Sequence, residues 1–274
     1  MKTMKLLPFL LVLCCLTAQA QDDSFPRKPK NMTAIIGAFA DEIDVIKNEM
    51  EDRHEERLEG LTFFEGKLKG RKIVAVLSGI GKVNAAVTTA ILLEHYRPRE
   101  VLFTGIAGGL DPAAQPGDII VATRIVHHDF GRRDHTGMVV RPTRNPYTLT
   151  ENPQYFPVDS SLLLLAGMVA PRIALEKVGA YQPVIRTGTI ATGDVFMSSD
   201  SAAKEVRAKL GADAVEMEGA AVGQVCYQQK VPFLIIRSLS DNANHSASVD
   251  MSTYGPIAAR NSAALVKALL ERLK

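Results

Sequence analysis

From residue 32 onward, short runs rich in β-branched residues alternate with longer stretches whose apolar residues recur every three or four positions. Short apolar runs predict buried strands, and the three-to-four spacing predicts helices. The strands are expected at 33–36, 71–77, 100–104, 118–124, 185–191, 214–216 and 233–238, and the clearest helices at 41–50, 81–95, 199–210, 217–229 and 255–273. This alternation indicates an α/β domain whose sheet is covered by helices on both faces.

The first twenty residues have the pattern of a cleavable secretory signal peptide. Lys2 and Lys5 form a basic start, residues 6–16 are apolar, and the sequence AQA at 18–20 is a small-residue cleavage site, so the mature chain is expected to begin near Gln21. The apolar run is far shorter than the ~20 residues of a membrane-spanning helix. A periplasmic or secreted protein is therefore expected.

Cysteines and charges constrain the rest of the chain. A lipoprotein signal is the alternative reading of the N-terminus, because Cys14 and Cys15 lie in its apolar run. After cleavage only Cys226 remains, which excludes an intramolecular disulfide. Loss of the two signal-peptide lysines leaves 30 basic residues against 30 acidic ones. A neutral chain has no basic excess for nucleic acid or an anionic membrane.

The mature chain is expected to form one domain behind a short leader. Residues 21–31 are polar and contain proline, which predicts a flexible leader. A hydrophobic content of 46% is enough for one sizeable core over residues 32–274. Within that domain, residues 130–157 carry four prolines and no clean periodicity, so a long loop is expected there.

Three acidic side chains follow the first expected strand. Asp41, Glu42 and Asp44 begin the helix after the strand breaks at Gly37. Acidic residues in the first turn of a helix interact favourably with the helix dipole, so these three residues can be explained by helix stability alone. Because ligands of open α/β sheets bind beyond the carboxyl ends of strands, one of the three can equally be a catalytic carboxylate.

Two further strands end in glycine-rich turns, at 77–86 and 101–111. Neither turn matches a nucleotide-binding pattern, since Val83 follows Lys82 where a P-loop requires Ser or Thr. Glycines such as Gly108 allow either a tight turn or the close approach of a ligand.

The last two expected strands end in carboxylates that are harder to explain structurally. Glu216 and Glu218 lie in a small, apolar run, and Asp241 follows the apolar strand at 233–238. A buried carboxylate is costly unless it is paired, and desolvation raises its pKa. Asp241 can therefore hold a proton for donation, although an ion pair with Arg237 is the alternative.

Metal and nucleophile chemistry find little support. His127 and His128 are adjacent and point to opposite sides of a strand, so they cannot easily share one ion. The sequence has no G-x-S-x-G elbow for a serine nucleophile, and Cys226 lies in an apolar helical stretch typical of a buried thiol.

Seven segments together resemble the methylthioadenosine/S-adenosylhomocysteine nucleosidases of the purine nucleoside phosphorylase superfamily. They are IIGAFADEI, SGIGKVNAA, TGIAGGL, PGDIIVA, TGDVFM, AVEMEGAA and VPFLIIRSLSDNA, and their order agrees over residues 32–274. The resemblance implies a single α/β domain around a twisted mixed β-sheet, no metal and no cofactor, a small-molecule nucleoside as ligand, and a homodimer.

The resemblance also implies a role for individual residues. Asp241, paired with Ser240, would protonate N7 of adenine, and Glu42 would activate the attacking water. Glu218 would bind the ribose hydroxyls and Met217 would contact the ribose. Phe196 would stack on the adenine face, and the backbone of Met197 would bind the purine edge. Gly108 would allow the chain to approach the substrate closely, and Arg237 would help to order the water. These roles suit an oxocarbenium-like transition state with a purine leaving group.

Groups that hold phosphate in the related phosphorylases are missing, which favours hydrolysis. Phe103 stands where those enzymes have an arginine, and residues 82–84 replace a Pro-Ser continuation of the glycine-rich loop. A phosphorylase remains one alternative, and a non-catalytic nucleoside-binding or storage protein of the same fold remains another.

Departures from the family pattern concern the 5′ side of the nucleoside. Ile106 stands where related enzymes commonly have Ser, and Phe39 where they commonly have Met. An exported enzyme would also meet other nucleosides than a cytoplasmic one. The expected substrate is methylthioadenosine- or S-adenosylhomocysteine-like, and Met251 and Tyr254 are candidates for reaching a neighbour's pocket in a dimer.

Overall fold

The computed structural model describes residues 29–135 and 137–273. The expected signal peptide, the alternative lipidation site and most of the expected leader lie outside the described residues. None of the helices in these two ranges combines the length and apolar character needed to cross a membrane.

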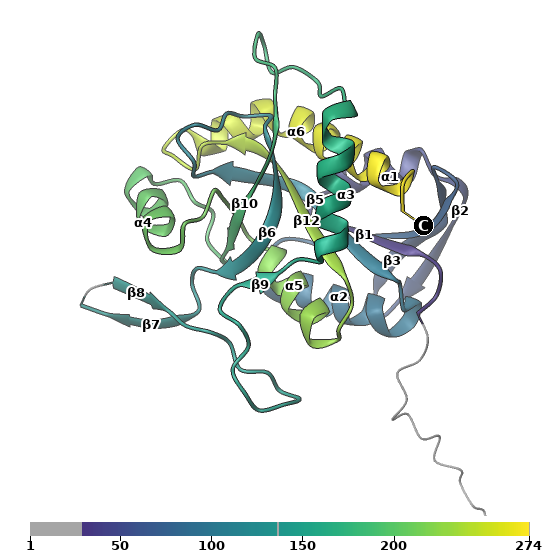
Figure 1. The fold of residues 1–274 in the computed structure, drawn as a ribbon, viewed down its shortest axis with the longest axis horizontal. Helices are drawn as coiled ribbons and strands as arrows, with labels where there is room; N and C mark the ends of the chain where they lie inside the picture. Colours follow the sequence, from purple (N-terminus) through teal and green to yellow (C-terminus); the bar gives the residue numbers. More distant parts are fainter. Residues whose placement is uncertain (1–28, 136, 274) are drawn as a thin grey trace, which may run out of the picture.

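Helices surround a central sheet in this chain (Figure 1). In chain order the elements are β1 (Thr33–Gly37), α1 (Ala40–Asn48), β2 (Glu51–Leu58), β3 (Leu61–Leu68), β4 (Arg71–Leu77), α2 (Lys82–Tyr96), β5 (Glu100–Gly109), β6 (Ile119–His127), β7 (Gly131–Asp134), β8 (Gly137–Val140), β9 (Phe156–Pro157), α3 (Ser160–Val169), a 3-10 turn (Ala170–Arg172), β10 (Ile185–Thr192), α4 (Asp200–Leu210), β11 (Ala214–Glu216), α5 (Gly219–Gln228), β12 (Phe233–Asp241) and α6 (Ala247–Leu270).

The sheet is mixed and partly closed. Its strand order is β11-β10-β6-β12-β5-β1-β4-β3-β2, and β11 also pairs with β5, so the first five strands form a ring. Strands β1, β4, β5 and β12 run parallel, whereas β6 is antiparallel to β12, and β3 is antiparallel to β4. This single α/β domain with a mixed sheet confirms the expected fold class.

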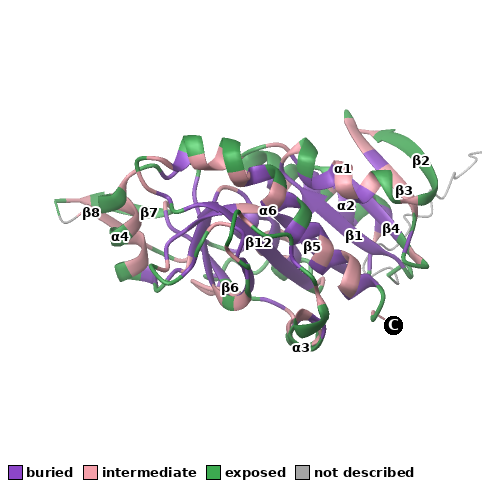
Figure 2. Cartoon of the chain, turned by 90° about the horizontal axis from the view of Figure 1, so that it is seen from above, coloured by how far each residue is buried: buried purple, intermediate pink, exposed green. Residues whose placement is uncertain are grey.

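The core lies along the central strands. Every residue of β12 is buried, and β5 is buried except for Ile106. Figure 2 shows the buried residues concentrated in the strands and the exposed ones on the outer helices and on β2. Helix α6 packs against β12 and β5 together with α1 and α3, while α2 packs against α5. Strands that are buried on both faces in this way require helices on both sides of the sheet.

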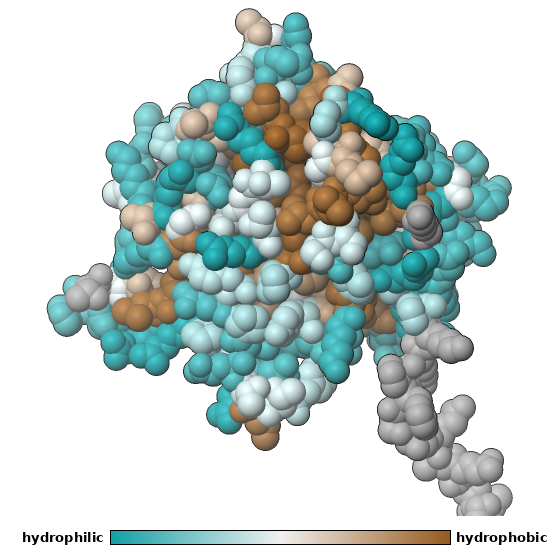
Figure 3. All heavy atoms as spheres, in the orientation of Figure 1, coloured by the Kyte–Doolittle hydropathy of each residue, from teal (hydrophilic) through white to brown (hydrophobic). Residues whose placement is uncertain are grey.

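Several elements differ from the expected boundaries. Strands β2 and β3 were not anticipated, because β2 reads EDRHEERL and exposes nearly all its side chains as an edge strand. Helix α3 was not anticipated either; apolar side chains gather along it in Figure 3, and Leu164 and Met168 are exposed there. Helix α6 begins at Ala247, before the expected residue 255, and carries Pro256 in its interior.

The proline-rich segment at 130–157 contains regular structure. Strands β7 and β8 pair as a hairpin that extends away from the sheet beside α4 (Figure 1). An isolated bridge joins Arg144 to Glu151, and Phe156 pairs with β6.

Candidate active site

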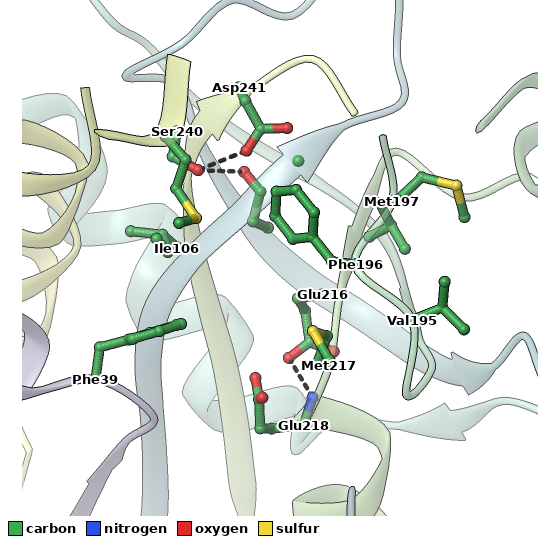
Figure 4. A pocket seen from close by; sticks show the side chains of 14 residues that line it. Phe39, Ile106, Val195, Phe196, Met197, Glu216, Met217, Glu218, Ser240 and Asp241 are labelled. Carbon is green, nitrogen blue, oxygen red and sulfur yellow. Dashed lines mark hydrogen bonds between the residues drawn. The ribbon is translucent and has the colours of Figure 1, made fainter. Parts of the chain in front are cut away.

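A cavity with about 470 Å³ of empty space, including space open to solvent, lies at the C-terminal ends of β5, β11 and β12. It is lined by Phe39, Ile106, Ala107, Gly108, Val195, Phe196, Met197, Val215, Glu216, Met217, Glu218, Ser240, Asp241 and Met251. Figure 4 shows Ser240 and Asp241 on one side of the cavity and Met217 and Glu218 on the other, with the Phe196 ring between them.

Asp241 is the last residue of β12 and is almost fully buried. A register shift between Leu239 and Asp241 changes the strand's pairing with β5 at this point. Ser240 Oγ donates to Asp241 Oδ2 at 2.7 Å, and the Ala243 backbone N–H donates to Oδ1 at 2.7 Å. Burial raises the pKa of Asp241, and these two hydrogen bonds oppose the rise. The result is a fixed carboxyl group with an increased tendency to hold a proton.

Gly108 is required by the close approach of β5 to this carboxyl group. A Cβ atom on Gly108 would lie 2.8 Å from Asp241 Oδ1 and 3.0 Å from Ala243 Cβ. Neither neighbour is a flexible chain end, since Asp241 is held by two hydrogen bonds. The glycine therefore leaves room for the acid.

Glu42 lies behind the cavity wall, in the first turn of α1. Its Oε2 accepts hydrogen bonds from the backbone N–H groups of Ala38 at 2.6 Å and Phe39 at 3.0 Å, and its Oε1 accepts one from Ile106 at 3.0 Å. Burial raises the pKa of Glu42, while the charge of Arg237 and the three amides lower it. The bond from Phe39 also caps α1, so the structural and the catalytic reading of this acid are compatible.

Arg237 forms a buried ion pair with Glu216. Its Nη2 lies 2.7 Å from Glu216 Oε2, and its guanidinium stacks 3.9 Å from the centre of the Phe103 ring. The alternative pairing of Arg237 with Asp241 is therefore not the one formed. A Cβ on Gly105 would lie 2.5 Å from Glu42 Oε1 and 2.9 Å from Arg237 Nη1. Arg237 and Glu42 thus approach the same point of β5 without lining the cavity.

Glu218 carries the second unusual carboxyl group of the cavity. Its Oε1 accepts a hydrogen bond from the Gly81 backbone N–H at 2.8 Å, and its own N–H donates to Glu216 Oε2 at 3.0 Å (Figure 4). Burial, and after it the charge of Glu216, raises the pKa of Glu218 well above its usual range. Glu216 is held further by Thr192 and by the Gly219 N–H.

The structure brings most of the expected site residues together. Seven of them line the cavity: Gly108, Phe196, Met197, Met217, Glu218, Ser240 and Asp241. Met251 lines this chain's own cavity with Phe39 and Ile106. Sequence reasoning did not anticipate Val195 and Val215, because single valines after apolar strands carry no site signal.

The adjacent histidines lie outside the cavity. His127 Nε2 is 3.0 Å from Gln224 Oε1, and burial lowers the pKa of both His127 and His128. Among the described residues, no three His, Cys, Asp or Glu side chains gather as a metal site.

Residues 33–271 match the family model described as the phosphorylase superfamily. A curated relative, the 5′-methylthioadenosine/S-adenosylhomocysteine nucleosidase of Psychromonas ingrahamii, is 38% identical over 240 residues, which cover 87% of this chain and 98% of the relative.

Solved structures are similar over the same region. The methylthioadenosine/S-adenosylhomocysteine nucleosidase of Colwellia psychrerythraea, in complex with adenine, has a TM-score of 0.77 at 36% identity, covering 89% of this chain and 96% of that one. The futalosine hydrolase of Helicobacter pylori has a TM-score of 0.76 at 31% identity, covering 89% of this chain and 98% of that one.

Proposed function

The chain belongs to the phosphorylase superfamily and, within it, to the 5′-methylthioadenosine/S-adenosylhomocysteine nucleosidases, and from this premise we propose how its residues act on a nucleoside. Its reaction is the hydrolysis of the N-glycosidic bond of a purine nucleoside. The observation that carries the assignment of roles is Asp241, a buried acid of raised pKa beside the Phe196 ring.

Asp241 is the proton donor in this proposal. A purine leaves readily only when N7 is protonated, because the electron pair of the C1′–N9 bond otherwise produces an anion. The raised pKa of Asp241 favours the protonated carboxyl group that this step needs. Phe196, 42% exposed at the mouth of the cavity, offers its ring to the base.

Glu42 receives the proton of the attacking water. Water adds to C1′ as the C1′–N9 bond breaks, and its proton passes to the Glu42 carboxylate, so that the products are a free base and a sugar with a C1′ hydroxyl group. Burial raises the pKa of Glu42, and Arg237 opposes that rise, which favours the ionised form that accepts a proton. Ile106, which lines the cavity, donates its backbone N–H to this carboxylate at 3.0 Å and so links Glu42 to the cavity wall.

Glu218 binds the ribose hydroxyls. It faces the cavity from the side opposite Asp241, together with Met217 (Figure 4). Its raised pKa favours the protonated carboxyl group, which can donate a hydrogen bond to one ribose hydroxyl group and accept one from another.

The 5′ substituent is expected to be apolar near the ribose. Phe39, Ile106 and Met251 provide no side-chain hydrogen-bond donor where a free 5′ hydroxyl group would require a partner. A thioether carbon chain loses nothing by burial against such a wall, whereas an unpaired hydroxyl group is penalised. We therefore favour methylthioadenosine over adenosine as substrate.

Adenine release should be measured from methylthioadenosine, S-adenosylhomocysteine, adenosine and inosine, with and without phosphate. We expect phosphate-independent turnover, fastest with the thioethers. Turnover that requires phosphate and yields a sugar 1-phosphate would mean a phosphorylase. Adenine binding without release from any nucleoside would mean a binding protein.

The assembly is proposed to be a homodimer and the location periplasmic or secreted. Ile80, Val83 and Val87 expose apolar side chains near the start of α2, and Val83 is 72% exposed. A second copy of the chain would cover this surface. Light scattering after size exclusion tests the dimer, and fractionation with N-terminal sequencing tests export and cleavage near Gln21.

A further inference from the structure

Lys82 joins the start of α2 to the loops that follow β6 and β10. Its Nζ lies 2.6 Å from Asp129 Oδ1 and 3.6 Å from Asp194 Oδ2, and its backbone N–H donates to Asp194 Oδ1 at 2.8 Å. The two aspartates also contact each other, because the Asp194 N–H donates to Asp129 Oδ2 at 2.8 Å. Asp129 follows β6, Asp194 follows β10, and Lys82 begins α2. These three residues are called the Lys82 cluster below.

The lysine stands at an unfavourable place for helix stability. The N-terminus of a helix carries partial positive charge and favours anions over cations. Helix α2 has no acidic residue in its first turn, and Asp194 supplies the missing carboxylate from a different loop. Local rules broken in this way usually indicate a role in function.

The same turn contacts the cavity directly. The N–H of Gly81, one residue before Lys82, donates to Glu218 Oε1 at 2.8 Å. On the other side, Asp194 immediately precedes Val195 and Phe196, which line the cavity. The Lys82 cluster is therefore linked through Gly81 to the carboxyl group assigned to the ribose and through Asp194 to the aromatic wall assigned to the base.

We propose that Lys82, Asp129 and Asp194 are positioning residues, which hold Glu218 and the wall at 195–197 in the arrangement that accepts a nucleoside. This inference rests on the proposed function for the identity of the substrate. The side chains of the cluster are 19%, 23% and 48% exposed. Ion pairs at that exposure contribute little to global stability, so the main effect falls on the loops that the pairs connect.

The first test compares Lys82→Met with Lys82→Arg. We expect Lys82→Met to raise KM for methylthioadenosine about tenfold while kcat stays within about threefold, because the lost alignment serves substrate and transition state alike. Lys82→Arg retains the charge and should recover most of the loss. Lys67→Met is the matched control: Lys67 pairs with Asp52 at 2.8 Å on the β2–β3 hairpin, outside the cavity.

The second test is a double-mutant cycle with Asp129→Asn. If Lys82 acts through Asp129, the double variant should be no weaker than Lys82→Met alone, since coupled residues are not additive. Independent, additive effects on KM would overturn the proposal.

Adenine binding by equilibrium dialysis separates this inference from the proposed function, because it needs no turnover. We expect Lys82→Met to weaken adenine binding while its melting temperature changes no more than that of Lys67→Met. Unchanged adenine affinity in Lys82→Met would refute the positioning role even if the wild type proved inactive on every nucleoside.

Discussion

Replacing Asp241 with asparagine removes a proton donor while leaving its surroundings almost unchanged. The asparagine Oδ1 can still accept from the Ala243 N–H, which lies 2.7 Å from the carboxyl group in the wild type. Its amide group would face Ser240 Oγ, which then accepts a hydrogen bond instead of donating one. The Ser240 hydroxyl can turn its hydrogen to the Ala107 carbonyl, 3.4 Å away. No buried polar atom loses its partner, so the penalty is confined to proton transfer.

The size of that penalty follows from the role. General acid catalysis contributes about 10²- to 10⁴-fold to a rate, which corresponds to about 3–5 kcal/mol of transition-state stabilisation. We expect Asp241→Asn to lower kcat by this factor. KM should change by less than about tenfold, because the walls of the cavity are unaltered.

The assay is adenine release from methylthioadenosine under saturating substrate, with adenine affinity measured in parallel. Asp52→Asn is a suitable control, since it makes the same chemical change at an exposed residue of β2 that does not line the cavity. An Asp241→Asn variant with kcat within about threefold of the wild type would refute the assignment of the acid. Loss of adenine binding together with kcat would indicate a disturbed site instead of a lost proton donor.

Three further predictions concern the groups around this acid. Gly108→Ala places a Cβ 2.8 Å from Asp241 Oδ1, so we expect kcat/KM to fall by about tenfold or more while circular dichroism stays unchanged; full activity would show that the acid can shift freely. Arg237→Met leaves Glu216 buried without its cation and should lower the free energy of unfolding by about 3–5 kcal/mol in urea titrations; a loss below about 1 kcal/mol would contradict the pairing. Burial raises the pKa of Glu42, and a base acts only when ionised, so kcat/KM should fall as pH decreases through a value above the ordinary 4.5 of glutamate; a profile flat down to that pH would exclude Glu42 as the base.

The sequence was sufficient for the central strands and for the acids at their ends. The runs that became β5 and β12 contain the apolar stretches VLF at 101–103 and FLII at 233–236, and their ends meet because parallel strands share an edge. Asp241 and Glu218 were recognisable as carboxylates in apolar surroundings. The 130–157 hairpin was not recognisable, because its strands are only four residues long and have no clear alternation.

Contacts between distant segments could not be predicted. Whether Arg237 would pair with Asp241 or with Glu216 depends on how β12 and β11 are placed around the ring, and composition does not determine this. The hydrogen bonds of the Lys82 cluster join residues that are separated in the sequence by 47, 65 and 112 positions. No local sequence pattern connects residues so far apart. Strand β2 could not be predicted either, because its charged sequence has no strand pattern and it forms a strand by pairing with β3.

The strand that closes the ring is also the shortest strand of that ring, and it leads directly into the ribose side of the cavity. Only two residues of β11 pair with β5, Ala214 and Val215, and Met217 and Glu218 follow immediately. The β11–β5 pairing has fewer paired residues than any other pairing of the ring, and a nucleoside in the cavity would contact the residues that follow β11. A ligand that binds only when β11 is paired with β5 stabilises that pairing. The β11–β5 pairing should therefore open less often in the occupied enzyme, and the β11 amides should exchange hydrogen with solvent more slowly than in the empty enzyme.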